Sequence, residues 1–178
     1  MKRRVLFPLL IWVLFQPLTG KAQWKFEKGS TSFSIKNAGL TVNGNFTGIA
    51  ATVQFDPTHP ELARIVASVE VKTLETGIGM RNKHVKGDGY FDAERFPTIK
   101  MMVTKFRKSE NQWICTCQLT IKETTKSFEI PVQFVENGKT ATLKSLFTIN
   151  RLDYHVGESS WTMGDLVKIE ITANLSQP

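Results

Sequence analysis

Apolar and polar residues alternate along most of the chain that follows residue 23. The clearest run covers residues 167–175, where every odd position is apolar and every even position is polar. A period of two places successive side chains on opposite faces of an extended strand. The same period predicts further strands in the stretches 40–46, 49–55, 65–72, 113–121, 128–134 and 143–149.

The first two of these stretches differ in register. Apolar residues occupy even positions from Leu40 to Phe46 and odd positions from Ile49 to Phe55, with Gly48 at the change. A glycine at such a point suits a bulge or a sharp bend in a strand. Turn residues separate other stretches, and they are Asp56-Pro57, Glu110-Asn111 and Asn137-Gly138. The Asn-Gly pair between two alternating runs is a strong hairpin signal.

Strands with one apolar and one polar face are typical of antiparallel sheets that have one face in water. Eight or so such strands in a small domain must pair their edges, and closure into a barrel does this. The pattern predicts an all-β fold, an eight-stranded antiparallel barrel, with a two-sheet sandwich as the competing architecture. Many aromatic residues share the apolar register. The pattern leaves open whether they fill a packed core or line a lumen.

The stretch 76–96 interrupts the alternation and predicts a short helix around residues 77–87. In it, Met80, His84 and Val85 have the three-to-four-residue spacing of an inward helical face. Two glycines just beyond these residues would end the helix. A helix inserted between strands is expected to cover one end of the barrel.

The N-terminus has the three-part layout of a secretory signal peptide. Basic residues at positions 2–4 precede an apolar run over residues 5–18, and small residues at positions 20 and 22 suit cleavage after Ala22. The apolar run is shorter than the ~20 residues of a membrane-spanning helix. We therefore expect a signal peptide at 1–22, one domain at 23–178, and a periplasmic or secreted protein.

The net charge falls once this segment is set aside. The full chain has 23 basic and 16 acidic residues, a formal net charge of +7. Residues 1–22 contain four of the basic residues and no acidic one, which leaves 19 against 16, or +3. That near balance gives no support to a nucleic-acid partner. The apolar share of 41% is ordinary for a globular domain that is held by its own core.

No motif for catalysis or metal binding occurs in the sequence. His59, His84 and His155 lack the spacing of metal ligands. A nucleophile elbow and a phosphate loop are also missing. We therefore expect no enzyme activity, no cofactor and no metal. A hydrolase that uses His84 with Asp88 or Asp92 stays as an alternative.

The two cysteines are two residues apart in one predicted strand. Side chains at that spacing point the same way with Cβ atoms ~6.8 Å apart, whereas a disulfide needs ~3.8 Å. Cys115 and Cys117 are therefore interpreted as small apolar residues in a core or a cavity wall.

Short motifs follow one another along the chain from residue 32. They are SFSIK at 32–36, VNGNFTG at 42–48, FDP at 55–57, TLETG at 73–77, RNKHV at 81–85, YFD at 90–92, FPTI at 96–99, LTIK at 119–122 and RLDY at 151–154. In order and spacing the set resembles the YceI-like family of lipocalin-like, polyisoprenoid-binding proteins. Asn82 departs from the family pattern, in which Asp is common at that position.

The resemblance implies an extended eight-stranded antiparallel lipocalin-like barrel with a helical segment at one end. It also implies an apolar lumen that binds, carries or sequesters a long isoprenoid, such as a polyprenyl phosphate or a quinone-type lipid, without catalysis. Family members often pair, so the chain is also a candidate homodimer. The alternative is an envelope stress or interaction module with a filled core and no lipid ligand.

Eleven residues are the candidate ligand-binding set. Arg81 and His84 are assigned to a polar or anionic headgroup at the mouth, and the others to the wall of the tunnel. The wall residues are Phe33, Ile35, Phe46, Phe91, Phe96, Trp113, Cys115, Cys117 and Phe147. Arg151 and Asp153 are expected to form a structural ion pair or a cap at the rim of the barrel.

Overall fold

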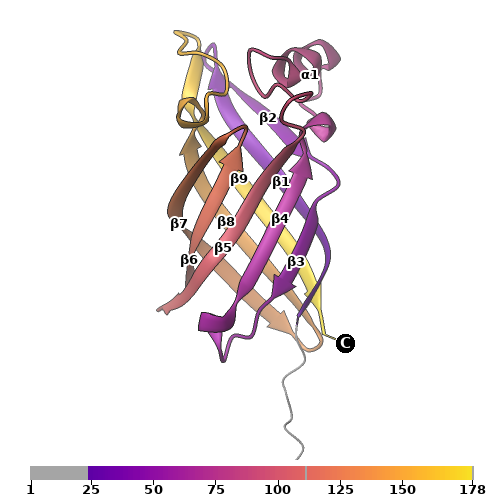
Figure 1. Cartoon of the computed structure of the whole chain (residues 1–178), viewed down its shortest axis with the longest axis vertical. Helices are drawn as coiled ribbons and strands as arrows, with labels where there is room; N and C mark the ends of the chain where they lie inside the picture. Colours follow the sequence, from indigo (N-terminus) through magenta and orange to yellow (C-terminus); the bar gives the residue numbers. More distant parts are fainter. Residues whose placement is uncertain (1–23, 111, 178) are drawn as a thin grey trace, which may run out of the picture.

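The computed structural model describes residues 24–110 and 112–177, and antiparallel strands make up most of it (Figure 1). The expected signal peptide and its cleavage site after Ala22 lie outside the described residues. Within these residues there are nine strands and one α-helix. They are β1 (Lys25–Asn37), β2 (Leu40–Phe46), β3 (Ala50–Gln54), β4 (Arg64–Glu70), α1 (Gly79–Lys86), β5 (Thr98–Ser109), β6 (Gln112–Ile121), β7 (Thr124–Asn137), β8 (Thr140–Asn150) and β9 (Met163–Ser176).

The strands form one sheet that curls around a common axis, which confirms the all-β, lipocalin-like barrel class. The order of the strands is β2-β1-β9-β8-β7-β6-β5-β4-β3. The two edge strands, β2 and β3, are consecutive in the chain, so three residues at 47–49 connect the two ends of the sheet.

The described residues form nine strands, whereas eight were predicted. At Gly48, where the sequence changes register, the run separates into β2 and β3, as predicted, whereas the alternation did not predict β1 or β5. Gly48 has a φ of +69°, a conformation that favours glycine. The chain bends there, so β2 pairs with β1 and β3 pairs with β4. One bent run of apolar residues thereby supplies both edges of the sheet.

Local sequence explains the hairpins. Asn137 pairs with Thr140 across the turn between β7 and β8, and Gly138 takes a positive φ of 61°, which confirms the hairpin predicted from Asn-Gly. The alternation then decides the inward face. In β6, for example, alternate residues from Trp113 to Ile121 are buried. The inward faces of the strands together make the apolar interior of the barrel.

The helix α1 lies at one end of the barrel (Figure 1). Its bounds fall within the predicted helix at 77–87. The expected inward face is wrong at Met80, which is 85% exposed. The buried side chain on this helix is that of Asn82, whose hydrogen bonds to Thr76 and Glu75 set the rotation of the helix. No helix of the described part of the chain has the length and apolar character needed to span a membrane.

Candidate functional site

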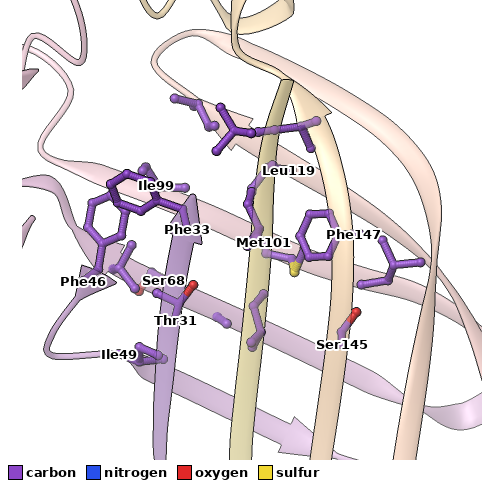
Figure 2. Close-up of a pocket in the computed structure, with 18 of the residues that line it drawn as sticks. Thr31, Phe33, Phe46, Ile49, Ser68, Ile99, Met101, Leu119, Ser145 and Phe147 are labelled. Carbon is purple, nitrogen blue, oxygen red and sulfur yellow. The ribbon is translucent and has the colours of Figure 1, made fainter. Parts of the chain in front are cut away.

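The barrel encloses one large apolar cavity of about 330 Å³. Its wall is made by inward side chains from all nine strands, together with residues of α1 and the loops beside it. Figure 2 shows part of this wall, with Phe33, Met101 and Phe147 around the space. Pockets for small ligands usually measure ~300–1,000 Å³ and are mostly apolar. The cavity therefore has the size and character of a ligand-binding site.

An aromatic cluster fills the end of the barrel opposite α1. Phe55 lies at its centre, with ring centroids 4.8 Å from Phe106, 5.6 Å from Trp113 and 5.1 Å from Phe134. Trp24 packs edge-on against Phe134 at 5.7 Å. Trp24 and Phe55 are almost fully buried. These rings occupy the space between the strand ends, so the cavity is closed on this side.

Three aromatic rings form a chain near the other end. Phe33 of β1 lies 5.7 Å from Phe46 of β2, and Phe46 lies 6.2 Å from Phe91 in the loop after α1. Phe33 pairs with Gly44 across the two strands. A Cβ atom on Gly44 would lie 2.3 Å from the Phe33 ring. The glycine therefore makes room for the ring to lie flat against β2, at the edge of the cavity.

A hydrogen-bond network fixes α1 to the end of the barrel. The side-chain oxygen of Asn82 accepts bonds from the backbone N–H of Thr76, at 2.8 Å, and from its hydroxyl, at 2.6 Å. The amide of Asn82 donates to the Glu75 carboxylate at 2.6 Å. That carboxylate also accepts from the backbone N–H groups of Thr76 and Gly77. These donors, above all Asn82, hold the pKa of Glu75 below its ordinary value.

The identity of residue 82 matters to this network. An aspartate would still accept from Thr76, but it has no N–H group to donate to Glu75. It would place two carboxylates within hydrogen-bond distance of each other. The asparagine in this chain is therefore matched to the glutamate at position 75.

Arg81 and His84 lie at the mouth of the cavity, as members of its wall. The Arg81 guanidinium donates to the Thr76 hydroxyl at 2.9 Å and to the Thr76 carbonyl at 2.5 Å, so it is held in one orientation. The His84 ring is exposed and packs edge-on against Tyr90 at 5.0 Å. Because the exposed side chain of His84 also lines the cavity, the cavity reaches the surface beside α1.

Arg151 is a buried cation at the same end, with 4% of its surface exposed. It donates to the carbonyls of Val156 and Gly164 and forms an ion pair of 3.0 Å with Asp165. The expected pairing with Asp153 is wrong. Arg151 and Asp153 share the short helix η3 (Arg151–Tyr154), whereas Asp165 of β9 faces Arg151 across the rim. The predicted role of Arg151 in an ion pair at the rim of the barrel is confirmed, with Asp165 as the partner.

Eight of the eleven candidate residues line the cavity, and three do not. The eight are Phe33, Ile35, Phe46, Arg81, His84, Phe91, Cys115 and Phe147. Trp113 belongs to the aromatic cluster at the closed end. Phe96 lies under the cations of Arg95 and Lys122, outside the cavity. Cys117 is buried in the packed core, where its thiol donates to the Phe128 carbonyl at 3.5 Å.

Many wall residues were not singled out from the sequence. They include Ile65, Ala67, Val69 and Met101 of β4 and β5, and small polar residues such as Ser68 and Ser145 (Figure 2). The signal that identifies most of them is the alternation itself, because inward positions of every strand contribute to the wall. The aromatic residues were preferred for their size, yet aliphatic side chains cover much of the surface.

The two thiols are buried and unreactive in character. Burial raises the pKa of the Cys117 thiol to about 11, and burial raises that of Cys115 further. A thiol is nucleophilic as the thiolate, so neither cysteine is activated at neutral pH. They are unpaired, as the strand geometry predicted.

Polar groups near the mouth form structural contacts. Asp88 accepts from the backbone N–H of Gly89, and Asp92 forms an ion pair with Arg95. Neither contact joins these acids to His84. Within residues 24–110 and 112–177, no group of three or more His, Cys, Asp or Glu side chains is arranged to hold a metal ion.

Comparison with known proteins identifies a family and several relatives. The family model of the YceI-like domain matches residues 24–175. A UPF0312 protein of Photorhabdus laumondii is 25% identical over 108 residues, which cover 60% of this chain and 56% of that protein. A UPF0312 protein of Pectobacterium atrosepticum is 22% identical, over 66% of this chain and 64% of its own length. The chain thus matches less than two thirds of each of these two relatives.

Solved structures share the fold over more of their length. BcnA of Burkholderia cenocepacia has a TM-score of 0.80 and 25% identity, over 84% of this chain and 99% of that one. A YCEI protein of Campylobacter jejuni has a TM-score of 0.70 and 23% identity, over 77% and 85%. A polyisoprenoid binding domain from Saccharophagus degradans has a TM-score of 0.69 and 12% identity, over 89% and 100%.

Proposed function

The chain belongs to the YceI-like domain family, and from this premise we propose that it binds a long-chain isoprenoid lipid in its lumen. The ligand is a polyprenyl phosphate or a quinone-type lipid, which the protein carries or sequesters without breaking or forming a bond. One observation supports this above the others, namely an apolar cavity closed at one end and open beside α1. The polyisoprenoid binding domain of Saccharophagus degradans has the same fold.

Burial of hydrocarbon supplies enough free energy for this function. Each buried CH₂ contributes ~0.8 kcal/mol, so one five-carbon prenyl unit contributes a few kcal/mol before the chain is ordered. An isoprenoid tail needs no polar partner along its length, and aliphatic and aromatic side chains make up most of the wall. The tail then enters past α1 and ends at the aromatic cluster around Phe55.

The mouth suits a polar or anionic headgroup. Arg81 is oriented by Thr76 through two of its five N–H donors, which leaves donors for a ligand. His84 lies beside it at the surface. We assign the headgroup to these two residues, and the tail to Phe33, Ile35, Phe46, Phe91, Cys115 and Phe147. The protein acts in the periplasm or after secretion, as the domain 23–178.

The test is the recovery and rebinding of the ligand. Purified protein is extracted with organic solvent, and the extract is examined by mass spectrometry. The stripped protein is then titrated with prenyl alcohols of increasing length, with saturated alcohols of equal carbon number as controls. We expect a prenyl lipid near one per chain, and an affinity that rises with each prenyl unit until the lumen is full.

Other outcomes count against the proposal. A protein that yields no lipid and binds none of the alcohols is the interaction module with no lipid ligand. An affinity that does not depend on chain length would show that the tail lies outside the lumen. Preference for the saturated alcohols would exclude the isoprenoid class while leaving a lipid site.

A further inference from the structure

The end of the barrel that carries α1 also carries large apolar side chains that face water. Trp161 is fully exposed, Leu40 is 72% exposed, and Ile78 and Met80 are exposed at the start of α1. We name these four residues the rim anchors. They come from two separate parts of the rim. Leu40 and Trp161 are near each other, because the backbone N–H of Ala38 donates to the Thr162 carbonyl at 2.7 Å.

The rim anchors flank the mouth of the cavity. Met163, two residues after Trp161, lines the cavity and pairs with Asn37, which in turn pairs with Leu40. On the other side, Val85 of α1 lines the cavity five residues after Met80. Figure 1 shows the hairpin of β1 and β2, the loop before β9 and α1 at the same end of the barrel.

Basic side chains accompany each group of anchors. The described helix α1 contains no acidic residue, and Lys83 is exposed one turn after Met80. Lys36 is exposed beside Leu40, where its ammonium group donates to the Thr41 hydroxyl at 2.7 Å. Phosphate groups at the surface of an anionic bilayer attract such cations.

From this arrangement we propose that the rim anchors dock the protein on the surface of a lipid bilayer that contains anionic phospholipid, with the mouth of the cavity against the lipid. Isolated apolar side chains that project from separate loops suit insertion into a fluid interface, whereas a protein partner would bury one continuous patch. Tryptophan is favoured at the level of lipid headgroups. The inference rests on the proposed function, because the use of docking is to let an isoprenoid tail pass from the bilayer into the lumen without crossing water.

The experiment measures binding of the full chain to vesicles of phosphatidylethanolamine and phosphatidylglycerol by co-sedimentation. Leu40→Ser and Trp161→Ser are compared with Leu62→Ser, a matched control that removes a similarly exposed leucine (67%) at the opposite end of the barrel. Transfer of one large apolar side chain into lipid is worth roughly a tenfold change in partitioning. We expect Leu40→Ser and Trp161→Ser each to weaken binding about tenfold, and Leu62→Ser to leave it unchanged.

All variants share the same N-terminal residues, so a difference in binding between them comes from the substituted side chain. Tryptophan emission gives a second readout. Trp24 and Trp113 are buried. If the emission maximum shifts to the blue when vesicles are added, and this shift disappears in Trp161→Ser, then the contact with lipid lies at the rim. Equal urea midpoints for the variants show that a change in binding is not unfolding.

Each result decides between the two proposals. If the wild-type chain and Leu40→Ser bind vesicles equally, or Leu62→Ser weakens binding as much, the docking surface is overturned even where a prenyl lipid is recovered. If binding depends on the rim anchors but the protein yields and binds no isoprenoid, docking stands and the proposed function fails. A wild-type dimer that ignores vesicles and dissociates on Leu40→Ser would make the rim a self-association surface and overturn docking.

Discussion

A bulky side chain placed inside the lumen provides the most direct test of where the ligand lies. Ala67 lines the cavity on β4, in the middle of the barrel, where it pairs with Ala51 on β3 and with Met101 on β5. A cavity of ~150 Å³ accommodates a benzene ring. The ring added by Ala67→Phe therefore takes up a large part, at most about half, of the 330 Å³ of free space.

The expected loss of affinity follows from the displaced hydrocarbon. A ring of this size excludes on the order of five carbons of a lipid tail, and at ~0.8 kcal/mol for each carbon this amounts to ~4 kcal/mol. Relaxation of the tail toward the mouth recovers part of that energy. We expect Ala67→Phe to weaken binding of a long prenyl alcohol at least ~100-fold in a calorimetric titration.

The neighbouring residue provides the control. Val66 is half exposed on the outer face of the same strand, so Val66→Phe adds the same ring outside the lumen and should leave the affinity unchanged. Urea unfolding of both variants checks the fold, since overpacking costs ~1–3 kcal/mol. If Ala67→Phe binds the alcohol as tightly as the wild-type chain, the ligand does not occupy the lumen and the reasoning is refuted.

Further predictions concern the rim and the buried groups. Arg151→Met should lower the free energy of unfolding by ~2–3 kcal/mol in urea, because it leaves the carbonyls of Val156 and Gly164 without their donor; a loss below ~1 kcal/mol would contradict this role. The pKa of Glu75 is lower in the folded protein than in the unfolded chain. The ionised carboxylate therefore stabilises the fold at pH values above the ordinary pKa of a glutamate, and this contribution is lost as the pH falls through the lowered pKa. The difference in melting temperature between the wild-type chain and Glu75→Gln should therefore shrink on acidification, and a constant difference would exclude this origin. Cys115 and Cys117 should resist iodoacetamide in the folded protein and react only in denaturant, as mass spectrometry can show; labelling of the folded protein would contradict their burial.

Local pattern was sufficient for much of the fold. The positions and inward faces of seven of the nine described strands, the hairpin at Asn137-Gly138 and the change at Gly48 follow from neighbouring residues, because a period of two and the φ preference of glycine are local properties. The rotation of α1 was predicted wrongly at Met80. Its cause is the contact of Asn82 with Thr76 and Glu75, and no periodicity within the helix contains that information.

The candidate site shows the same division. Phe33, Phe46 and Phe91 were selected separately from the sequence, and the barrel brings their rings together at the edge of the cavity. Arg151 was expected to bond within its own segment, whereas its partner is Asp165 on another strand. Side chains far apart in the chain become neighbours only through strand pairing, which the sequence of one segment does not specify.

The sequence by itself determined that an apolar interior exists and which side of each strand faces it. Only the tertiary structure decided how that interior is divided into a filled part and a hollow part. Trp113 and Phe147 occupy equivalent inward positions in their strands, yet one packs in the aromatic cluster and the other lines the cavity. The physical reason is volume, because free space is what remains when inward side chains from all the strands have been packed against one another.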